Sequence, residues 1–380
     1  MIIKNGALFC DDGIFRQIDI EIINGTVAAF GSGLTIGGQE SIDAGGCFVI
    51  PGLIDIHTHG ALGADFCDGT PEAIERIAQF LLNQGVTGFL GTSMALSEES
   101  LGNIFRNARP FVGKFVQGQA VLHGINMEGP FFNKEKRGAQ NEKYITRADF
   151  DLFTRLNELS GGGIRTVAVA PEPEGNLEFI SKASRVCSVS IAHSSANYET
   201  ASMAFDNGAK HVTHLFNGMT PFHHRDPGII GAAADHGAYV EVICDGVHIH
   251  PSMVRAIYKI FTDERVCLIS DAMRACGMPD GQYELGGQSV VVSEGVASIP
   301  GGSLAGSVCS LPECLRRAVE FGVPLESALK SATINPARAM GIDAGSITKG
   351  KRADLLITDK KLALKNVILN GEVQHSINRM

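Results

Sequence analysis

The segment Cys47–His59 reads CFVIPGLIDIHTH and carries an apolar run into two histidines. Alternate side chains of a β-strand point to the same face, so His57 and His59 project together where the run ends. Two neutral imidazoles that converge at a strand end form half of a divalent-metal site. The pair alone is a weak signal, because one histidine can pack in the core while the other is solvated.

Apolar runs recur through the middle of the chain, and each is a candidate strand. The eight runs are Cys47–His57, Val86–Ser93, Ala120–Met127, Ile164–Ala170, Val186–His193, His211–Leu215, Tyr239–Cys244 and Val266–Ser270. Helical patterns follow several of them, at Pro71–Asn83, Asn176–Ser184, Tyr198–Asn207 and Pro251–Thr262. Strands that alternate with helices favour a parallel sheet, and this number closes a (β/α)8 TIM-like barrel. The insertion Gly281–Ser298 predicts two short strands before the barrel's final helix.

The two ends of the chain have a different texture. Short β-like runs alternate with glycine-rich turns at Ala7–Cys10, Gln17–Ile23 and Val27–Gly31, and again at Ala353–Asp359 and Lys365–Glu372. Segments of similar character at both ends predict pairing with each other. We therefore expect residues 1–46 and 346–380 to form one small β-sandwich domain, and residues 47–345 to form the barrel.

Composition excludes several classes of function. Hydrophobic residues make up 44% and charged residues 19%, which is typical of a well-buried globular protein. The net charge of −9, without a Lys/Arg stripe, disfavours nucleic acid as a partner. No apolar stretch approaches ~18 residues, and no signal peptide is expected, so a membrane is not a predicted partner. Nine scattered cysteines without CxxC spacing predict reduced thiols in a cytoplasmic protein.

Ligand-type residues recur where the predicted strands end, which is where TIM barrels carry their functional residues. Besides the first pair they are Glu128, His193, His211, His214, Asp245, His248 and Asp271. Each has an ordinary alternative, because a buried histidine can bond a carbonyl and an aspartate can cap a helix. Six of the eight strands end in this way, which favours a metal site at the barrel mouth.

The ligand set suggests two divalent ions bridged by Glu128. His57 and His59 would hold one ion, and His193 and His214 the other. Imidazole and carboxylate ligands suit Zn, Fe(II), Mn, Co or Ni, and the sequence does not choose among these metals or between one and two ions. Such ions turn water into a nucleophile near neutral pH. The predicted chemistry is hydrolysis of a polarised carbonyl or C–N bond.

Two further features belong to the same mouth. Asp271 is not needed as a ligand, so it is the natural general base and then the general acid for the leaving group. Arg225 lies in a loop punctuated by glycine and proline, where a guanidinium suits planar recognition of phosphate or carboxylate. The alternative is a surface arginine paired with Asp226. His248 is a candidate for the same anion or for a structural role.

Ten short motifs, spread over nearly the whole chain, form one specific set. They are PGLIDIHTHG (51–60), HGINMEGPFFN (123–133), GAQN (138–141), AHSS (192–195), HVTHLFNGM (211–219), HHRDPGIIG (223–231), DGVH (245–248), LISDAM (268–273), GSLAGS (302–307) and NPAR (335–338). The set resembles the N-acetylglucosamine-6-phosphate deacetylases of the amidohydrolase superfamily.

The resemblance implies hydrolysis of the acetamide of a 6-phosphorylated amino sugar, which yields glucosamine 6-phosphate and acetate. It implies metal ligands at Glu128, His193 and His214, a catalytic carboxylate at Asp271, and sugar-phosphate contacts at Asn217, Gly218, Arg225 and His248. In relatives the phosphate-binding arginine reaches in from the neighbouring subunit, which implies a homodimer with shared sites.

Three positions refine the resemblance. Some relatives lack the HxH pair and use one metal, so His57 and His59 group this chain with those that can hold two. Some relatives have a substrate-contacting histidine at the position of Gln140. Whether this position polarises the substrate carbonyl therefore stays open for this chain. Ile164–Ala170 contains no lysine, in agreement with Glu128 rather than a carboxylated lysine as the bridge.

Other functions compete with this interpretation. N-acetylgalactosamine 6-phosphate is the nearest alternative substrate, because no motif distinguishes the two epimers. A dihydroorotase-like or D-amino-acid deacylase-like enzyme would need no phosphate site, so Arg225 would be dispensable. A metal-free scaffold would be expected to have lost ligands, whereas all five and Asp271 are present.

Overall fold

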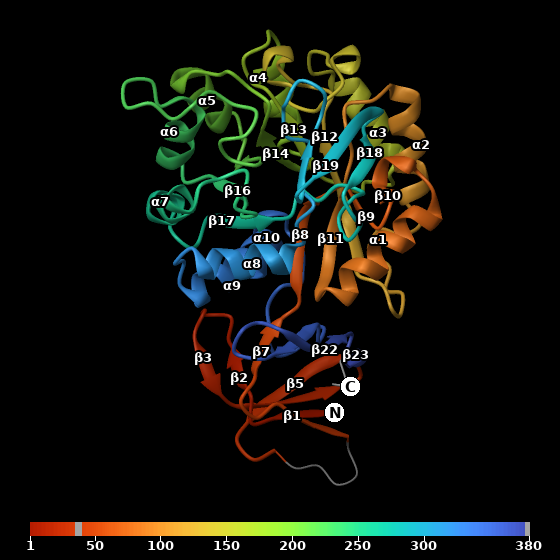
Figure 1. The fold of residues 1–380 in the computed structure, drawn as a ribbon, viewed down its shortest axis with the longest axis vertical. Helices are drawn as coiled ribbons and strands as arrows, with labels where there is room; N and C mark the ends of the chain where they lie inside the picture. Colours follow the sequence, from red (N-terminus) through yellow and green to blue (C-terminus); the bar gives the residue numbers. More distant parts are fainter. Residues whose placement is uncertain (35–39, 377–380) are drawn as a thin grey trace.

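The middle of the chain forms a barrel of parallel strands, with a smaller β unit beneath it (Figure 1). The computed structural model describes residues 1–34 and 40–376. The eight barrel strands, in order around the sheet, are β8 (Leu53–Thr58), β11 (Val86–Thr92), β12 (Val121–Glu128), β13 (Ile164–Val169), β14 (Ser188–Ile191), β15 (His211–Val212), β16 (Tyr239–Ile243) and β17 (Val266–Ile269). The first and last meet where the Asp271 N–H donates to the His57 carbonyl at 2.9 Å. The predicted barrel is confirmed.

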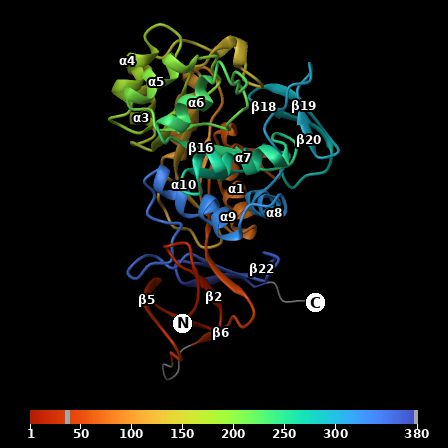
Figure 2. The ribbon, with the colours of Figure 1, turned by 90° about the vertical axis from the view of Figure 1, so that its left-hand side faces the viewer.

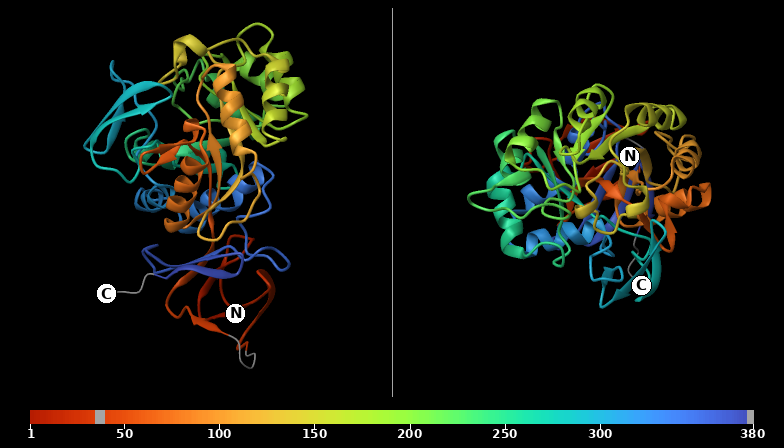
Figure 3. Two further views of the ribbon diagram at one scale, coloured as in Figure 1. Left: turned by 90° about the vertical axis from the view of Figure 1, so that its right-hand side faces the viewer. Right: turned by 90° about the horizontal axis from the view of Figure 1, so that it is seen from above.

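Helices surround this barrel, as the view from above shows (Figure 3). They are α1 (Pro71–Asn83), α2 (Glu98–Ala108), α3 (Phe150–Leu159), α4 (Asn176–Ala183), α5 (Tyr198–Asp206), α6 (Gly228–Asp235), α7 (Pro251–Phe261), α8 (Leu311–Glu320), α9 (Leu325–Ala332) and α10 (Ile334–Ala339). The start of α1 follows from its sequence, since the Thr70 side chain accepts from the Ala73 N–H, and Pro71 has no N–H that would need an acceptor in the first turn. Within the described ranges, no helix is both long and apolar enough to cross a membrane.

The two chain ends build the smaller unit together. One sheet, in the order β5-β4-β1-β6, comprises β5 (Thr26–Gly31), β4 (Asp19–Ile23), β1 (Ile2–Lys4) and β6 (Ser41–Asp43). The other, in the order β23-β22-β21-β7-β2-β3, comprises β23 (Glu372–Ser376), β22 (Leu364–Leu369), β21 (Leu355–Thr358), β7 (Phe48–Pro51), β2 (Ala7–Phe9) and β3 (Phe15–Gln17). Ile3, Ile20 and Leu355 belong to one buried cluster that draws on both sheets. The expected pairing of the two ends in a β-sandwich is confirmed.

The prediction of a single strand over Cys47–His57 is wrong, because this segment forms two strands in the structure. β7 pairs with β2 and β21 in the small unit, whereas β8 opens the barrel. Gly52 lies between them, and a Cβ at that position would collide with the Thr87 side chain at the start of β11. A continuous apolar run does not reveal that a chain changes sheets. The division of the chain after residues 46 and 345 stays a prediction.

Smaller elements complete the barrel mouth. The insertion forms three antiparallel strands rather than the expected two, namely β18 (Gly281–Leu285), β19 (Gln288–Ser293) and β20 (Val296–Ser298), and it stands at one side of the barrel (Figure 2). Three helices, α8 to α10, follow it instead of one. Near the mouth lie β9 (Gly60–Ala61), β10 (Ala64–Asp65) and three 3-10 turns, η1 (Phe66–Asp68), η2 (Lys134–Lys136) and η3 (Glu142–Tyr144).

Candidate metal centre

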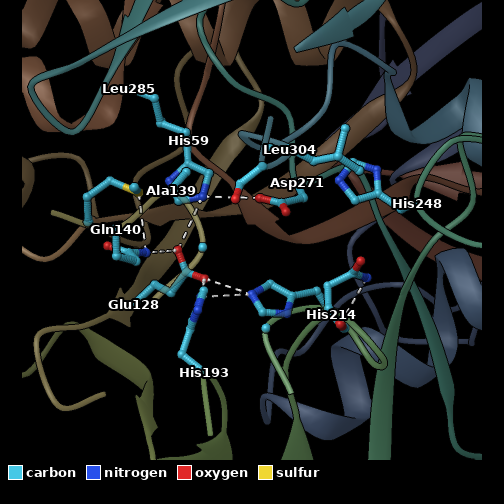
Figure 4. A pocket seen from close by; sticks show the side chains of 16 residues that line it. His59, Glu128, Ala139, Gln140, His193, His214, His248, Asp271, Leu285 and Leu304 are labelled. Carbon is cyan, nitrogen blue, oxygen red and sulfur yellow. Dashed lines mark hydrogen bonds and ion pairs between the residues drawn. The ribbon is translucent and has the colours of Figure 1, made fainter. Parts of the chain in front are cut away.

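The five ligand candidates converge at the carboxyl ends of the barrel strands. Glu128 Oε1 lies 3.2 Å from His193 Nε2 and 3.1 Å from His214 Nε2. On the other side, Glu128 Oε2 lies 3.4 Å from His59 Nε2, and Oε1 lies 3.7 Å from His57 Nε2. Figure 4 shows three of these imidazoles pointing at the one carboxylate. Two buried groups that could hold a metal therefore share Glu128, as the sequence predicts.

The hydrogen bonds around these side chains fit a bound cation. His193 Nδ1 lies 2.8 Å from the Lys136 carbonyl, which can only accept, so Nδ1 carries the proton. The lone pair of His193 Nε2 then faces the Glu128 carboxylate and also His214 Nε2, 3.2 Å away. Lone pairs directed at a buried carboxylate repel unless a cation lies among them. Imidazole and carboxylate donors of this kind suit a divalent transition metal.

Negative charge is concentrated at the centre. Asp271 Oδ1 lies 3.2 Å from His59 Nε2 and 3.4 Å from His57 Nε2. Burial alone would raise the pKa of Asp271, but the two histidines lower it, which favours the carboxylate form that can accept a proton. Burial alone would lower the pKa of His57, but Asp271, Glu241 and Glu128 raise it well above its ordinary value. A divalent cation would neutralise this excess of buried carboxylates.

The backbone is strained where it presents three of these side chains. His193, His214 and Asp271 have φ angles of 45°, 28° and 47°, in the left-handed region that L-residues rarely adopt. Each lies within two residues of the end of a barrel strand, so the turn redirects the side chain into the mouth. The Ser307 N–H donates to the Asp271 carbonyl at 2.7 Å and holds one of these turns. Strain of this kind persists only where the surrounding structure enforces it.

A buried glutamate behind the ligands was missed by the sequence analysis. Glu241 Oε2 lies 2.8 Å from His57 Nδ1, and its Oε1 lies 2.9 Å from His211 Nε2. Burial alone would raise the pKa of Glu241, but these two histidines lower it to about 2. The available signal was a charged residue within the apolar strand YVEVI, because a buried charge requires partners.

A cavity of about 300 Å³ opens over the ligands. Its lining includes four of the five predicted substrate contacts, namely Gln140, Asn217, Gly218 and His248. It also includes side chains that the sequence analysis did not single out, from the loops after several strands and from the insertion: Met94, Ala139, Leu285, Ser303 and Leu304. The apolar members come mainly from separate loops, which hydrophobic periodicity does not bring together.

Gln140 and Gly218 contact the ligand cluster directly. Gln140 Nε2 donates to Glu128 Oε2 at 2.9 Å, while its Oε1 accepts from the Ala95 N–H at 2.7 Å. Gly218 has a φ of 60°, and a Cβ there would lie 2.9 Å from His193 Nδ1. The close approach of this loop to His193 therefore requires glycine. Gln140 holds Glu128 in place from the side opposite His193.

Arg225 is the predicted substrate contact that this chain does not bring to the cavity. The side chain is exposed and does not line the cavity. Its Nη1 lies 2.7 Å from His224 Nε2, and its backbone N–H donates to His223 Nδ1 at 3.3 Å. Among the described residues, the hydrogen bonds of Arg225 are to these two histidines, and the alternative pairing with Asp226 is not among them.

An eight-stranded barrel with a buried histidine–carboxylate cluster at its mouth defines a class, the barrel hydrolases that use divalent metal ions. Residues 48–374 match the model of the amidohydrolase family, and the chain belongs to that family.

Individual relatives are similar over nearly the whole chain. The N-acetylglucosamine-6-phosphate deacetylase of Bacillus subtilis (strain 168) is 36% identical, covering 98% of this chain and 93% of the relative. The N-acetylgalactosamine-6-phosphate deacetylase of Escherichia coli O157:H7 is 32% identical, covering 98% of both. A solved structure of a Mycobacterium smegmatis N-acetyl-D-glucosamine-6-phosphate deacetylase variant, in complex with N-acetyl-D-glucosamine-6-phosphate, superposes with a TM-score of 0.93 at 31% identity and 99% coverage of each chain.

Proposed function

We propose that this chain is an N-acetylglucosamine-6-phosphate deacetylase, which hydrolyses the acetamide of its substrate to glucosamine 6-phosphate and acetate. The observation that carries the proposal is the buried His–Glu cluster, with Asp271 beside it at the base of a substrate-sized cavity. Similarity over the full chain to relatives with this activity supports the choice of substrate. The nine free thiols support a reducing, cytoplasmic location.

Five side chains of the chain provide the metal ligands in this proposal. Glu128, His193 and His214 would hold one divalent ion, and Glu128 with His57 and His59 would hold a second. A divalent ion bound there supplies the acidity that makes water a nucleophile and polarises the amide carbonyl. The donor set fits Zn, Fe(II), Mn, Co or Ni.

Asp271 carries the proton transfers in this proposal. Its carboxylate lies within 3.4 Å of both histidines of the HxH pair, beside the residues that would hold the metal. It accepts the proton of the attacking water and then donates it to the departing amine nitrogen. The hydrogen bonds of its strained turn keep the carboxylate in this position.

The sugar phosphate occupies the cavity above the ligands. Asn217, His248 and the backbone of Gly218 line the side on which the sugar and its phosphate would lie. His248 Nδ1 lies 2.7 Å from Asp245 Oδ2, which orients the ring. Gln140 forms another part of the wall, and its amide is already engaged by Glu128 and Ala95.

Arg225 completes the phosphate site of the neighbouring subunit in a homodimer. The support for this step is its exposure in a loop outside its own cavity, together with the need for a cation near a phosphate. A homodimer of this kind places one Arg225 at each of two shared sites.

N-acetylgalactosamine 6-phosphate is a second candidate substrate, favoured by similarity to the Escherichia coli O157:H7 relative. Deacetylation should be measured on metal-reconstituted protein with both epimers, each with and without the 6-phosphate. We expect the gluco phosphate to have the highest kcat/KM. A higher value for the galacto phosphate would replace the proposed substrate. Equal turnover with and without phosphate would point to another amidohydrolase.

A further inference from the structure

Glu241 is a buried carboxylate that none of the proposed steps uses. It projects from β16, and only 1% of its surface is exposed. Its Oε2 accepts from His57 Nδ1 at 2.8 Å and from the His214 N–H at 3.2 Å, and its Oε1 accepts from His211 Nε2 at 2.9 Å. A buried charge is tolerated only when it is paired and hydrogen-bonded in this way. Three donors directed at one carboxylate therefore indicate a defined role behind the metal centre.

The contact to Glu241 determines which nitrogen of His57 is free. An ionised carboxylate can only accept, so the proton of a neutral His57 lies on Nδ1. The lone pair is then on Nε2, which is buried and makes no hydrogen bond within the described residues. Nε2 lies 3.4 Å from Asp271 Oδ1 and 3.7 Å from Glu128 Oε1. Glu241 thus directs the only free lone pair of His57 at the position between these two carboxylates.

The two halves of the centre depend on Glu241 differently. The ring of His193 is held from behind by the Lys136 carbonyl, and Glu241 reaches His214 through its backbone N–H rather than its ring. The His59 ring has no hydrogen bond at Nδ1 within the described residues, so nothing behind it fixes its tautomer. On the HxH side, the ring contact that fixes a tautomer is therefore the one between His57 and Glu241. Removing the charge of Glu241 should weaken that side more than the His193 side.

We propose that Glu241 is a positioning residue that decides whether the His57–His59 side of the centre holds its divalent ion, with His211 supporting it from behind. The inference rests on the proposed two-ion centre and deepens it. The carboxylate fixes the tautomer of His57 and raises the basicity of Nε2, as hydrogen-bond partners of metal-bound histidines generally do. The proposal concerns metal binding, so it can be tested without substrate.

The test compares Glu241→Gln with the wild type by titration with Zn²⁺ alone, and by elemental analysis after removal of free metal. Glutamine keeps the shape of glutamate and can still accept from His57, but it lacks the charge. We expect about two ions per wild-type chain, and an affinity for the second ion that falls roughly 10- to 100-fold in Glu241→Gln. His57→Ala should bind about one ion, because it removes a ligand of the same position. Asp354→Asn removes a buried carboxylate of the small β unit and should keep both ions.

Unchanged affinity of Glu241→Gln for the second ion would overturn the proposal, as would a wild type that binds a single ion under all conditions. If Glu241→Gln does not fold, ¹⁵N NMR of the histidine side chains in the zinc-loaded wild type replaces it, with His57→Ala to assign the signal. The expected His57 proton lies on Nδ1, and a proton on Nε2 would overturn the proposal. Deacetylation by the wild type is a separate measurement. Two bound ions without deacetylation would refute the proposed function and leave the role of Glu241 standing.

Discussion

The barrel mouth and the Arg225 loop differ in how firmly their polar side chains are held. At the mouth, the five ligand candidates and Asp271 are buried, and their backbone is fixed by neighbouring hydrogen bonds. In the loop, Pro221–Asp226 is exposed throughout, and the hydrogen bonds that Arg225 makes within the described part of the chain are to His223 and His224. One chain therefore brings together the groups proposed for bond cleavage, whereas the arginine proposed for anion recognition lies outside its own cavity.

Removal of metal should have the largest effect on deacetylation, because it removes the function of the barrel mouth and leaves the Arg225 loop unchanged. The imidazoles gathered around the Glu128 carboxylate form two groups that could hold a metal ion. We expect exhaustive chelation to abolish deacetylation, and a divalent ion to restore it. Metal content should be measured on the same samples. Full activity in demonstrably metal-free protein would contradict the hydrolytic mechanism.

Asp271→Asn tests the mouth at a single side chain. General acid–base catalysis contributes roughly 10²–10⁴-fold, and more is expected when one group serves both proton transfers. The variant should therefore lose at least about a hundredfold in kcat. Metal content is the control. It should stay unchanged, because asparagine preserves the shape of the side chain and Asp271 is not a required ligand. If more than about a tenth of wild-type kcat remained, the role assigned to Asp271 would be wrong.

Much of the mouth could be predicted from the sequence because the signals there are local. His57 and His59 share a face through the period of two of a strand, and ligand-type residues at successive strand ends meet in any parallel barrel. The helix Pro71–Asn83 follows from its cap and its apolar spacing. These elements need no knowledge of distant partners.

The remaining features depend on contacts between distant segments. Glu241 pairs with His57 across 184 positions of sequence, and no periodicity reports such a pair. The division of β7 from β8 depends on the close approach of Gly52 to Thr87. The proposed role of Arg225 at a neighbouring subunit's site depends on contacts between chains, which single-chain patterns do not describe.

Arg225→Ala tests the loop. A hydrogen bond to a charged group contributes about 1.5–3 kcal/mol. We therefore expect kcat/KM for the 6-phosphorylated sugar to fall roughly ten- to several-hundredfold. The unphosphorylated N-acetyl sugar should be a poor substrate for both proteins, and nearly equally poor. Equal damage to both substrates would make Arg225 structural and place the phosphate site elsewhere.

Mixing Arg225→Ala with Asp271→Asn should give the smallest change in activity. It also shows most directly whether the loop and the mouth of one site come from different chains. In a dimer of Arg225→Ala with Asp271→Asn, one site combines an intact Asp271 with the intact Arg225 of the other chain, and the second site is defective twice. Random exchange of equal amounts should restore about a quarter of wild-type activity, because half of the dimers are mixed and each has one intact site. Activity should rise only after subunit exchange, which mass spectrometry of differently labelled chains can follow. Two copies of either variant alone should show no such rise. If exchange is complete and activity stays at the level of the separate variants, Arg225 serves its own chain, and the loop must then move toward the cavity when the sugar phosphate binds.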